Sequence, residues 1–251
     1  MAVDGNKFGA TITVVSSNAS YHTYTDWGLI VTEGDPIGDP EQERNYINVP
    51  GRPNLLDASE ALTGGPIFKG RQIDIPVVIT GRPDAWTTTV SRIRNAIDGR
   101  QVKVVFDDDP SHYWLGRCKI QNTSRIKRLG RFNITFYVDA YKYEIASSQE
   151  QLRWDDMNFL TDCLRYLGEI TVTNSYALVI QHGEHAVVPK IKVASITSQA
   201  FTMHSSSNNK TYTLTAGTWR FPDLKVAGAD DVTLTFTGSA KVTITYRGES
   251  L

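Results

Sequence analysis

The sequence predicts a mainly β protein of the β-rich α+β class, in which an N-terminal β-barrel-like or sandwich-like domain with one helix precedes a C-terminal β-sandwich. Three observations predict it: apolar and polar residues alternate along much of the chain, one segment has helical spacing, and the alternation is interrupted after Tyr143. Alternation places apolar side chains on one face of a strand, whereas spacings of three and four place them on one face of a helix. We therefore expect two domains, residues 1–146 and 147–251.

Alternating segments define the predicted strands of the first half. Isoleucine and valine share one face of residues 72–80, and Pro76 within it favours an edge strand because proline lacks a backbone N–H. The same alternation recurs over residues 102–106 and 132–138. These segments predict a sheet with one buried face.

One helix is predicted between these strands, where apolar residues of 86–97 are spaced by four, three and four. Asp84 is the expected N-cap and Gly99 the expected C-terminal stop. Three threonines follow Trp86 and are mediocre helix formers, so the helix should depend on packing onto a sheet. We expect Trp86 and Ile97 to lie in that packed stripe.

The second half alternates in short segments that are separated by turn residues, which is typical of a β-sandwich. The apolar positions of these predicted strands are Ile170/Val172, Leu178/Ile180, Ile191/Val193, Tyr212/Leu214, Val232/Leu234/Phe236 and Val242/Ile244/Tyr246.

A proline- and glycine-rich stretch from Glu33 to Asn54 predicts a long exposed loop rather than a regular element. Such a loop is uncommon in a compact domain unless it binds something, so it is the first candidate for an interface. The residues expected at an inter-subunit or partner contact are Glu33, Asp35, Asp39, Glu41 and Arg44.

Composition excludes several classes of partner. The 251 residues include 26 Lys+Arg and 27 Asp+Glu, so the net charge of -1 gives no field to attract nucleic acid or an anionic membrane. No apolar run approaches the ~20 residues of a membrane span, and the N-terminus lacks the features of a secretory signal. Cys118 and Cys163 are expected to be free thiols of a chain made in a reducing cytoplasm.

The sequence contains only weak candidates for catalytic or metal-binding residues. Asp107, Asp108 and Asp109 could bind a cation or act as acid and base, but carboxylates before Pro110 are more typical of a turn. His182 and His185 lie in a glycine-containing loop without a third ligand. Neither GxSxG nor a Walker motif occurs, so we expect no catalytic activity, no metal and no cofactor.

Aromatic residues of the second half have two interpretations. They could stack on sugar rings, or they could lie in the core or at a contact between subunits, which we favour. These residues are Trp154, Tyr166, Tyr176, Trp219 and Phe221.

Three segments in order carry a family resemblance: a "VPGR" turn and strand over Asn45–Val77, a helix and the run "DDDPSHYWLGR" over Trp86–Ile120, and a strand ending "DAYKYE" over Leu129–Glu144. Together they resemble the distal tail protein (Dit) family of long-tailed bacteriophages and prophages. The second half resembles the galectin-like sandwich of that family in architecture only.

The resemblance implies a structural role in the virion, with synthesis in the host bacterial cytoplasm. Family members form rings, typically hexamers, that join the tail tube to the baseplate or host-recognition apparatus. The implied partners are other copies of the chain, the tail tube protein, and tail-fibre or receptor-binding proteins. Two rivals remain open: a carbohydrate-binding module that recognises the host wall through the second domain, and a wall hydrolase using Asp107 or Asp109.

Overall fold

The structure, a computed structural model, describes residues 9–32, 37–61, 65–79, 85–126, 129–149, 165–183, 185–226 and 231–251. The chain folds as two compact units, Met1–Lys142 and Tyr143–Leu251. Both are β-rich, and the predicted fold class is confirmed. Predicted features that lie outside the described residues are Glu33, Asp35, the N-cap Asp84, Trp154 and Cys163.

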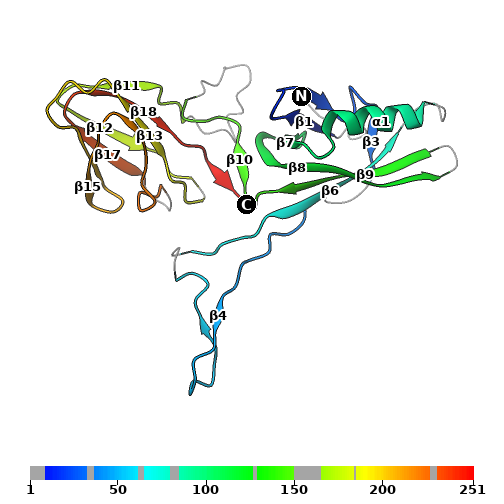
Figure 1. Cartoon of the computed structure of the whole chain (residues 1–251), viewed down its shortest axis with the longest axis horizontal. Coiled ribbons are helices and arrows are strands. Elements are labelled where there is room, and N and C mark those ends of the chain that lie inside the picture. Colours follow the sequence, from blue (N-terminus) through cyan, green and yellow to red (C-terminus); the bar gives the residue numbers. More distant parts are fainter. Residues whose placement is uncertain are drawn as a thin grey trace. The chain divides into compact units, whose positions relative to one another are not determined.

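The first unit is built on one antiparallel sheet that curls into a half-barrel (Figure 1). Within this unit its strands follow the order β2-β1-β7-β8-β9-β6-β3. Their bounds are β1 Ala10–Val14, β2 Ser20–His22, β3 Leu29–Val31, β6 Arg71–Ile79, β7 Gln101–Phe106, β8 Asp109–Ile126 and β9 Leu129–Val138. Buried residues alternate with half-buried or exposed ones along β1, β6 and β7, so the apolar face predicted from the sequence forms the core.

Helix α1 (Trp86–Ile97) is the only helix among the described residues, and it confirms the predicted segment. Its buried residues Val90, Ile93 and Ile97 pack into the same core as the sheet. Gly99 follows the helix with a φ of +72°, a conformation that suits glycine, and so provides the predicted stop. Trp86 is only half-buried at the edge of this core rather than inside it.

Pro76 corrects one expectation. Strand β6 is not an edge strand, because β9 pairs along one side and β3 along the other. The strand pairing of β3 covers only Val77–Ile79 and ends before the proline, while the pairing of β9 continues across it. The Pro76 carbonyl accepts a hydrogen bond from the Thr32 backbone at 3.0 Å.

The second unit is a sandwich of two four-stranded antiparallel sheets, β11-β18-β13-β16 and β12-β17-β14-β15. The apolar positions expected from the sequence form its separate core. Its strands are β10 Lys142–Glu144, β11 Glu169–Val172, β12 Ser175–Ile180, β13 Lys190–Ala194, β14 Thr202–Ser205, β15 Lys210–Thr213, β16 Gly217–Arg220, β17 Val232–Thr237, β18 Ala240–Thr245 and β19 Glu249–Ser250. Strand β10 begins on the last residue of the first unit and pairs with β19.

Candidate functional site

The first unit carries a two-limbed extension, described over residues 37–61 and 65–69, which we call the arm (Figure 1). The first limb leads to β4 (Tyr46–Ile47), and the second returns from β5 (Leu56–Asp57) to β6. β4 and β5 pair antiparallel, and nearer the sheet Gln42 and Phe68 form a β-bridge with backbone hydrogen bonds on either side. In Figure 1 the arm extends away from the main sheet.

The arm corrects the prediction of an irregular loop over residues 33–54. The described part of that stretch is exposed, as expected, but it forms one limb of a hairpin because residues beyond 54 return and pair with it. The chain reverses near Gly51, which has a φ of +84°. Hydrogen bonds from Ser59 steady the returning limb and lower the pKa of Asp57.

The distal part of the arm presents large apolar side chains to solvent. We call this set the distal apolar surface; its members are Tyr46, Ile47, Val49, Leu55 and Leu56. Tyr46 is 50% exposed and Leu55 is 58% exposed. Single exposed apolar residues are ordinary, but five on one thin hairpin, of which Ile47 and Leu56 are direct cross-strand neighbours, indicate an interaction site. Because an isolated two-stranded hairpin is at best marginally stable, the arm gains most from packing on a partner.

Arg71, the first residue of β6, holds the root of the arm. Its guanidinium is largely buried, donates to the backbone carbonyls of Gly38 and Ala140, and lies 4.8 Å from the Trp114 ring centre. Burial lowers the pKa of Arg71, and the negative charge of Asp39 opposes that effect. Asp39, one of the residues predicted at a contact, therefore also stabilises the charge of Arg71 at the root of the arm.

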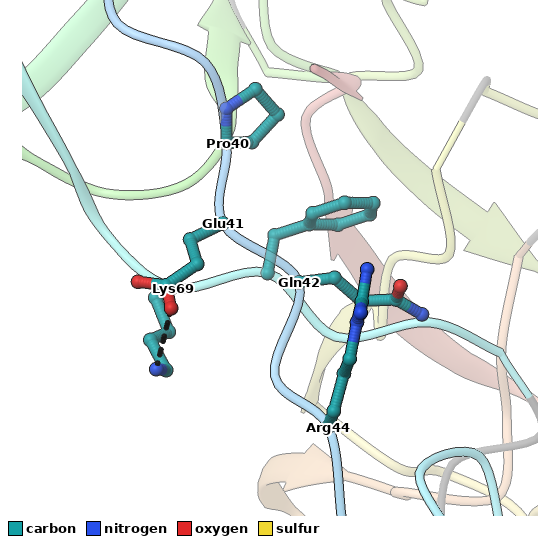
Figure 2. Close-up of a pocket in the computed structure, with 6 residues that line it drawn as sticks. Pro40, Glu41, Gln42, Arg44 and Lys69 are labelled. Atoms are coloured by element: carbon teal, nitrogen blue, oxygen red, sulfur yellow. Dashed lines mark hydrogen bonds and ion pairs between the residues drawn. The ribbon is translucent and has the colours of Figure 1, made fainter.

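The groove beside the root has a volume of about 670 Å³ and is lined by Pro40, Glu41, Gln42, Arg44, Phe68 and Lys69. Figure 2 shows Glu41 and Lys69 on one side of the first limb, where they form an ion pair at 3.3 Å, and Gln42 and Arg44 on the other. Small-molecule sites are usually enclosed and mostly apolar, and this groove is open and polar. Its geometry suits a contact with another macromolecule.

The structure thus places Asp39, Glu41 and Arg44 on one limb, with Arg44 on the opposite face from Glu41. The sequence analysis did not predict that the candidate site also includes Lys69, Arg71 and the apolar pair Leu55–Leu56. A signal was available, because two apolar pairs that flank a Pro-Gly turn indicate a hairpin. The predicted loop ended at Asn54, before the second of these pairs.

Asp107 and Asp108 form the predicted turn, whereas Asp109 and Pro110 already belong to β8. Asp107 contacts His22 Nε2 at 3.2 Å, while Asp109 binds His112 Nδ1 and Lys142 Nζ, each at 2.8 Å. Burial raises the pKa of Asp109, but the hydrogen bonds from Lys142 and His112 outweigh it and hold that pKa below its ordinary value. A carboxylate with a lowered pKa is ionised at neutral pH and is a poor general acid.

The histidine pair of the second unit lies in a loop, as expected. His182 binds Asp231 through Nδ1 at 2.8 Å, and burial lowers the pKa of His185. Within the described ranges, no three His, Cys, Asp or Glu residues come together as a metal site. Cys118 is a free, buried thiol whose pKa burial raises well above its ordinary value.

The aromatic candidates of the second unit lie mostly against its core. Trp219 stacks parallel to Phe221 with 6.1 Å between ring centres, and Tyr212 lies 4.2 Å from the same phenylalanine. All three are half-buried and pack against the core of the sandwich. Tyr166 and Tyr176 are more exposed, at 50% and 41%.

Comparisons with known proteins identify the architecture. No protein-family model matches the sequence, and no curated protein matches it. Among solved structures, the chain is similar to the SPP1 Dit protein (gp 19.1), a hub adsorption protein of phages that infect Gram-positive bacteria, with a TM-score of 0.63 at 11% identity over 96% of this chain and 99% of that one. The chain has the Dit fold. The resemblance predicted from the sequence is confirmed for the fold.

A second similar chain belongs to the phage P2 baseplate in its activated conformation, with 7% identity over 97% of this chain and 98% of that one. Its TM-score is 0.44. None of the helices in the described part of the chain has the length and apolar character to cross a bilayer.

Proposed function

We propose that this chain is a structural subunit of a phage tail tip, where copies assemble into a ring that joins the end of the tail tube to the host-recognition apparatus. The observation that carries the proposal is the distal apolar surface, which is exposed on an arm of a Dit fold. The second unit would hold baseplate or receptor-binding proteins, and the role needs no catalytic residue.

Ring assembly would give the arm a neighbouring subunit on which its exposed apolar side chains can pack. Full burial of each large apolar side chain stabilises an interface by roughly 1.5–3 kcal/mol, before the cost of ordering the arm is subtracted. A closed ring repeats the same contact around its axis and leaves no arm exposed. We infer six copies, the number typical of the family that the sequence resembles, which corresponds to about 167 kDa for chains of 27.9 kDa.

Mass photometry of the wild-type chain and of a Leu55→Asp/Leu56→Asp variant tests the proposal. A carboxylate at each position would have to be desolvated on association, so the variant should remain monomeric at concentrations where the wild type assembles. Arg52→Asp, an exposed charged position on the same arm tip, is the matched control and should assemble as the wild type does. Equal assembly of all three chains would contradict the role of the distal apolar surface.

Carbohydrate binding through the second unit is the alternative. The exposed residues Tyr166 and Tyr176 are the aromatic side chains that would carry it. Binding of the purified chain to host cell wall, lost in a Tyr166→Ala/Tyr176→Ala variant that still assembles, would support this second function.

A further inference from the structure

The second unit carries positive charge that its own described residues do not neutralise. Lys190 and Lys192 flank buried Ile191 on β13, and Arg220 of β16 is the direct cross-strand neighbour of Lys190. Lys190, Lys192 and Arg220 are exposed, and none of them forms an ion pair with a residue that the structure describes. We call these three residues the cationic face.

This arrangement is unfavourable in an isolated chain. Side chains directly opposite each other on antiparallel strands have Cβ atoms about 5 Å apart, and like charges at that spacing repel. Residues two apart on one strand, as Lys190 and Lys192 are, lie ~7 Å apart on the same face. Lys241 of the same sheet, by contrast, pairs with Glu169 at 2.7 Å. Carboxylates supplied from outside would relieve the repulsion on the cationic face.

The first limb of the arm carries the complementary pattern. Asp39, Glu41 and Glu43 are exposed and alternate with the half-buried Pro40 and Gln42. Around the bridge of Gln42 the backbone is extended, which places Glu41 and Glu43 on one side of the limb about 7 Å apart. Glu41 forms an ion pair with the exposed Lys69, and Asp39 also lies near the charge of Arg71 at the root of the arm. We call these three acidic residues the acidic limb.

We propose that the acidic limb of one copy docks on the cationic face of a second copy. The proposal rests on the proposed function, because it requires copies of the chain to associate. The two surfaces have opposite charge, the same two-residue repeat and extended backbones, so carboxylates and cations can meet in register. Exposed charge pairs contribute more to the rate and the register of association than to its affinity. The contact would select the correct alignment of neighbours, while the distal apolar surface supplies most of the affinity.

A soluble polyanion fits the cationic face less well than a second copy does. Affinity for a polyanion grows with the number of charges neutralised, and the cationic face offers only three cations on a chain with a net charge of -1. The neighbouring exposed residues of β16 and β18, Thr218 and Thr245, offer no ring to stack on a sugar or a base.

Charge reversal of the full-length chain tests the docking. At 50 mM salt, Glu41→Lys/Glu43→Lys and Lys190→Glu/Lys192→Glu should each raise the concentration for half-assembly by about tenfold, and combining both pairs should restore it to within about threefold. The differences should vanish at 500 mM salt, where charges are screened over ~4 Å. Lys210→Glu, an exposed lysine on the other sheet, is the control and should assemble as the wild type does. Wild-type assembly by both reversed variants would overturn the docking and leave the proposed function standing.

Cross-linking distinguishes docking of the acidic limb on a second copy from docking within the same chain. A mixture of a Glu43→Cys chain and a Lys192→Cys chain, oxidised at low salt, should give a disulfide-linked dimer above the background of the wild type and of either variant alone. A link formed only within a chain that carries both substitutions, or no link at all, would overturn the proposal. A wild type that never assembles would contradict the docking and the proposed function together.

Discussion

Gly130 on β9 and Trp86 at the start of α1 share one site. A Cβ atom on Gly130 would lie 1.3 Å from Trp86 Nε1, so the indole occupies the space that any larger residue would need. The clash involves a broad ring rather than the end of a flexible chain. The glycine therefore allows the first turn of the helix to lie close to the sheet.

Gly130→Ala should destabilise the first unit by about 1–3 kcal/mol, because Trp86 must leave its position to admit the methyl group. Gly65→Ala is the matched control, since a Cβ there meets nothing within 4 Å. Chemical denaturation followed by tryptophan fluorescence measures both variants. Equal stability of the two would show that the indole does not depend on Gly130.

Asp109 makes stability depend on pH. Its pKa is lowered in the folded chain, so its contribution is present above the ordinary carboxyl pKa of ~3.9 and is lost as pH falls through the lower, folded value. Asp109→Asn should lower the unfolding temperature at pH 7 and make no difference near pH 2. The change should stay below about 1 kcal/mol, because the carboxylate is 35% exposed and water screens its ion pairs. Thermal unfolding across this pH range checks it, and a difference that persists at pH 2 would contradict the assignment.

At the scale of elements, the sequence predicts those helices and strands in which buried apolar residues recur at a regular spacing. The helix and strands β6, β7 and β9 lie where apolar spacing placed them, because each buries one face in a single core. The arm was not predictable in the same way, since its limbs bury no face and are recognised only by their pairing. The contact between Gly130 and Trp86 joins residues far apart in sequence, and no local pattern encodes it.

Arg165 holds two elements of the second unit together, and the sequence analysis did not predict this role. It is buried, binds both carboxylate oxygens of Glu144 at 2.7 and 3.0 Å, and donates to the carbonyls of Gln181 and His182. The pair thereby connects β10 to the loop after β12 within the second unit. Tertiary structure brings Arg165 and Glu144 together. In the sequence, each of them looks like an ordinary charged surface residue.

Glu144→Gln should destabilise the second unit by about 3 kcal/mol, because it leaves the Arg165 guanidinium buried without a counter-charge. Glu169→Gln is the control: it removes an ion pair with Lys241 in which both side chains are about half exposed, and should cost less than about 1 kcal/mol. Hydrogen exchange at the amides of β13 and β18 reports the stability of this unit. Similar exchange in the two variants would contradict the role of Arg165.

For the whole molecule, the two separate cores predict that Tyr143–Leu251 folds without the first unit. The fragment must begin at residue 143, because Glu144 and Ser148 both bond within the second unit. We expect it to be monomeric, since the arm belongs to the first unit. Trp86→Ala in the full chain should cost near the lower end of ~3–5 kcal/mol, because the indole is half-buried, and should leave the second unit folded. Size exclusion and circular dichroism test the fragment, and an aggregated or self-assembling fragment would contradict this division.

The central claim is that copies of the chain close into a ring through the arm. Negative-stain electron microscopy of the purified full-length protein tests it most directly, because it shows both closure and symmetry. The account predicts closed rings of six copies with a central opening for the wild type, and no rings for the Leu55→Asp/Leu56→Asp variant. Isolated monomers at every protein concentration, or open filaments in place of rings, would contradict it.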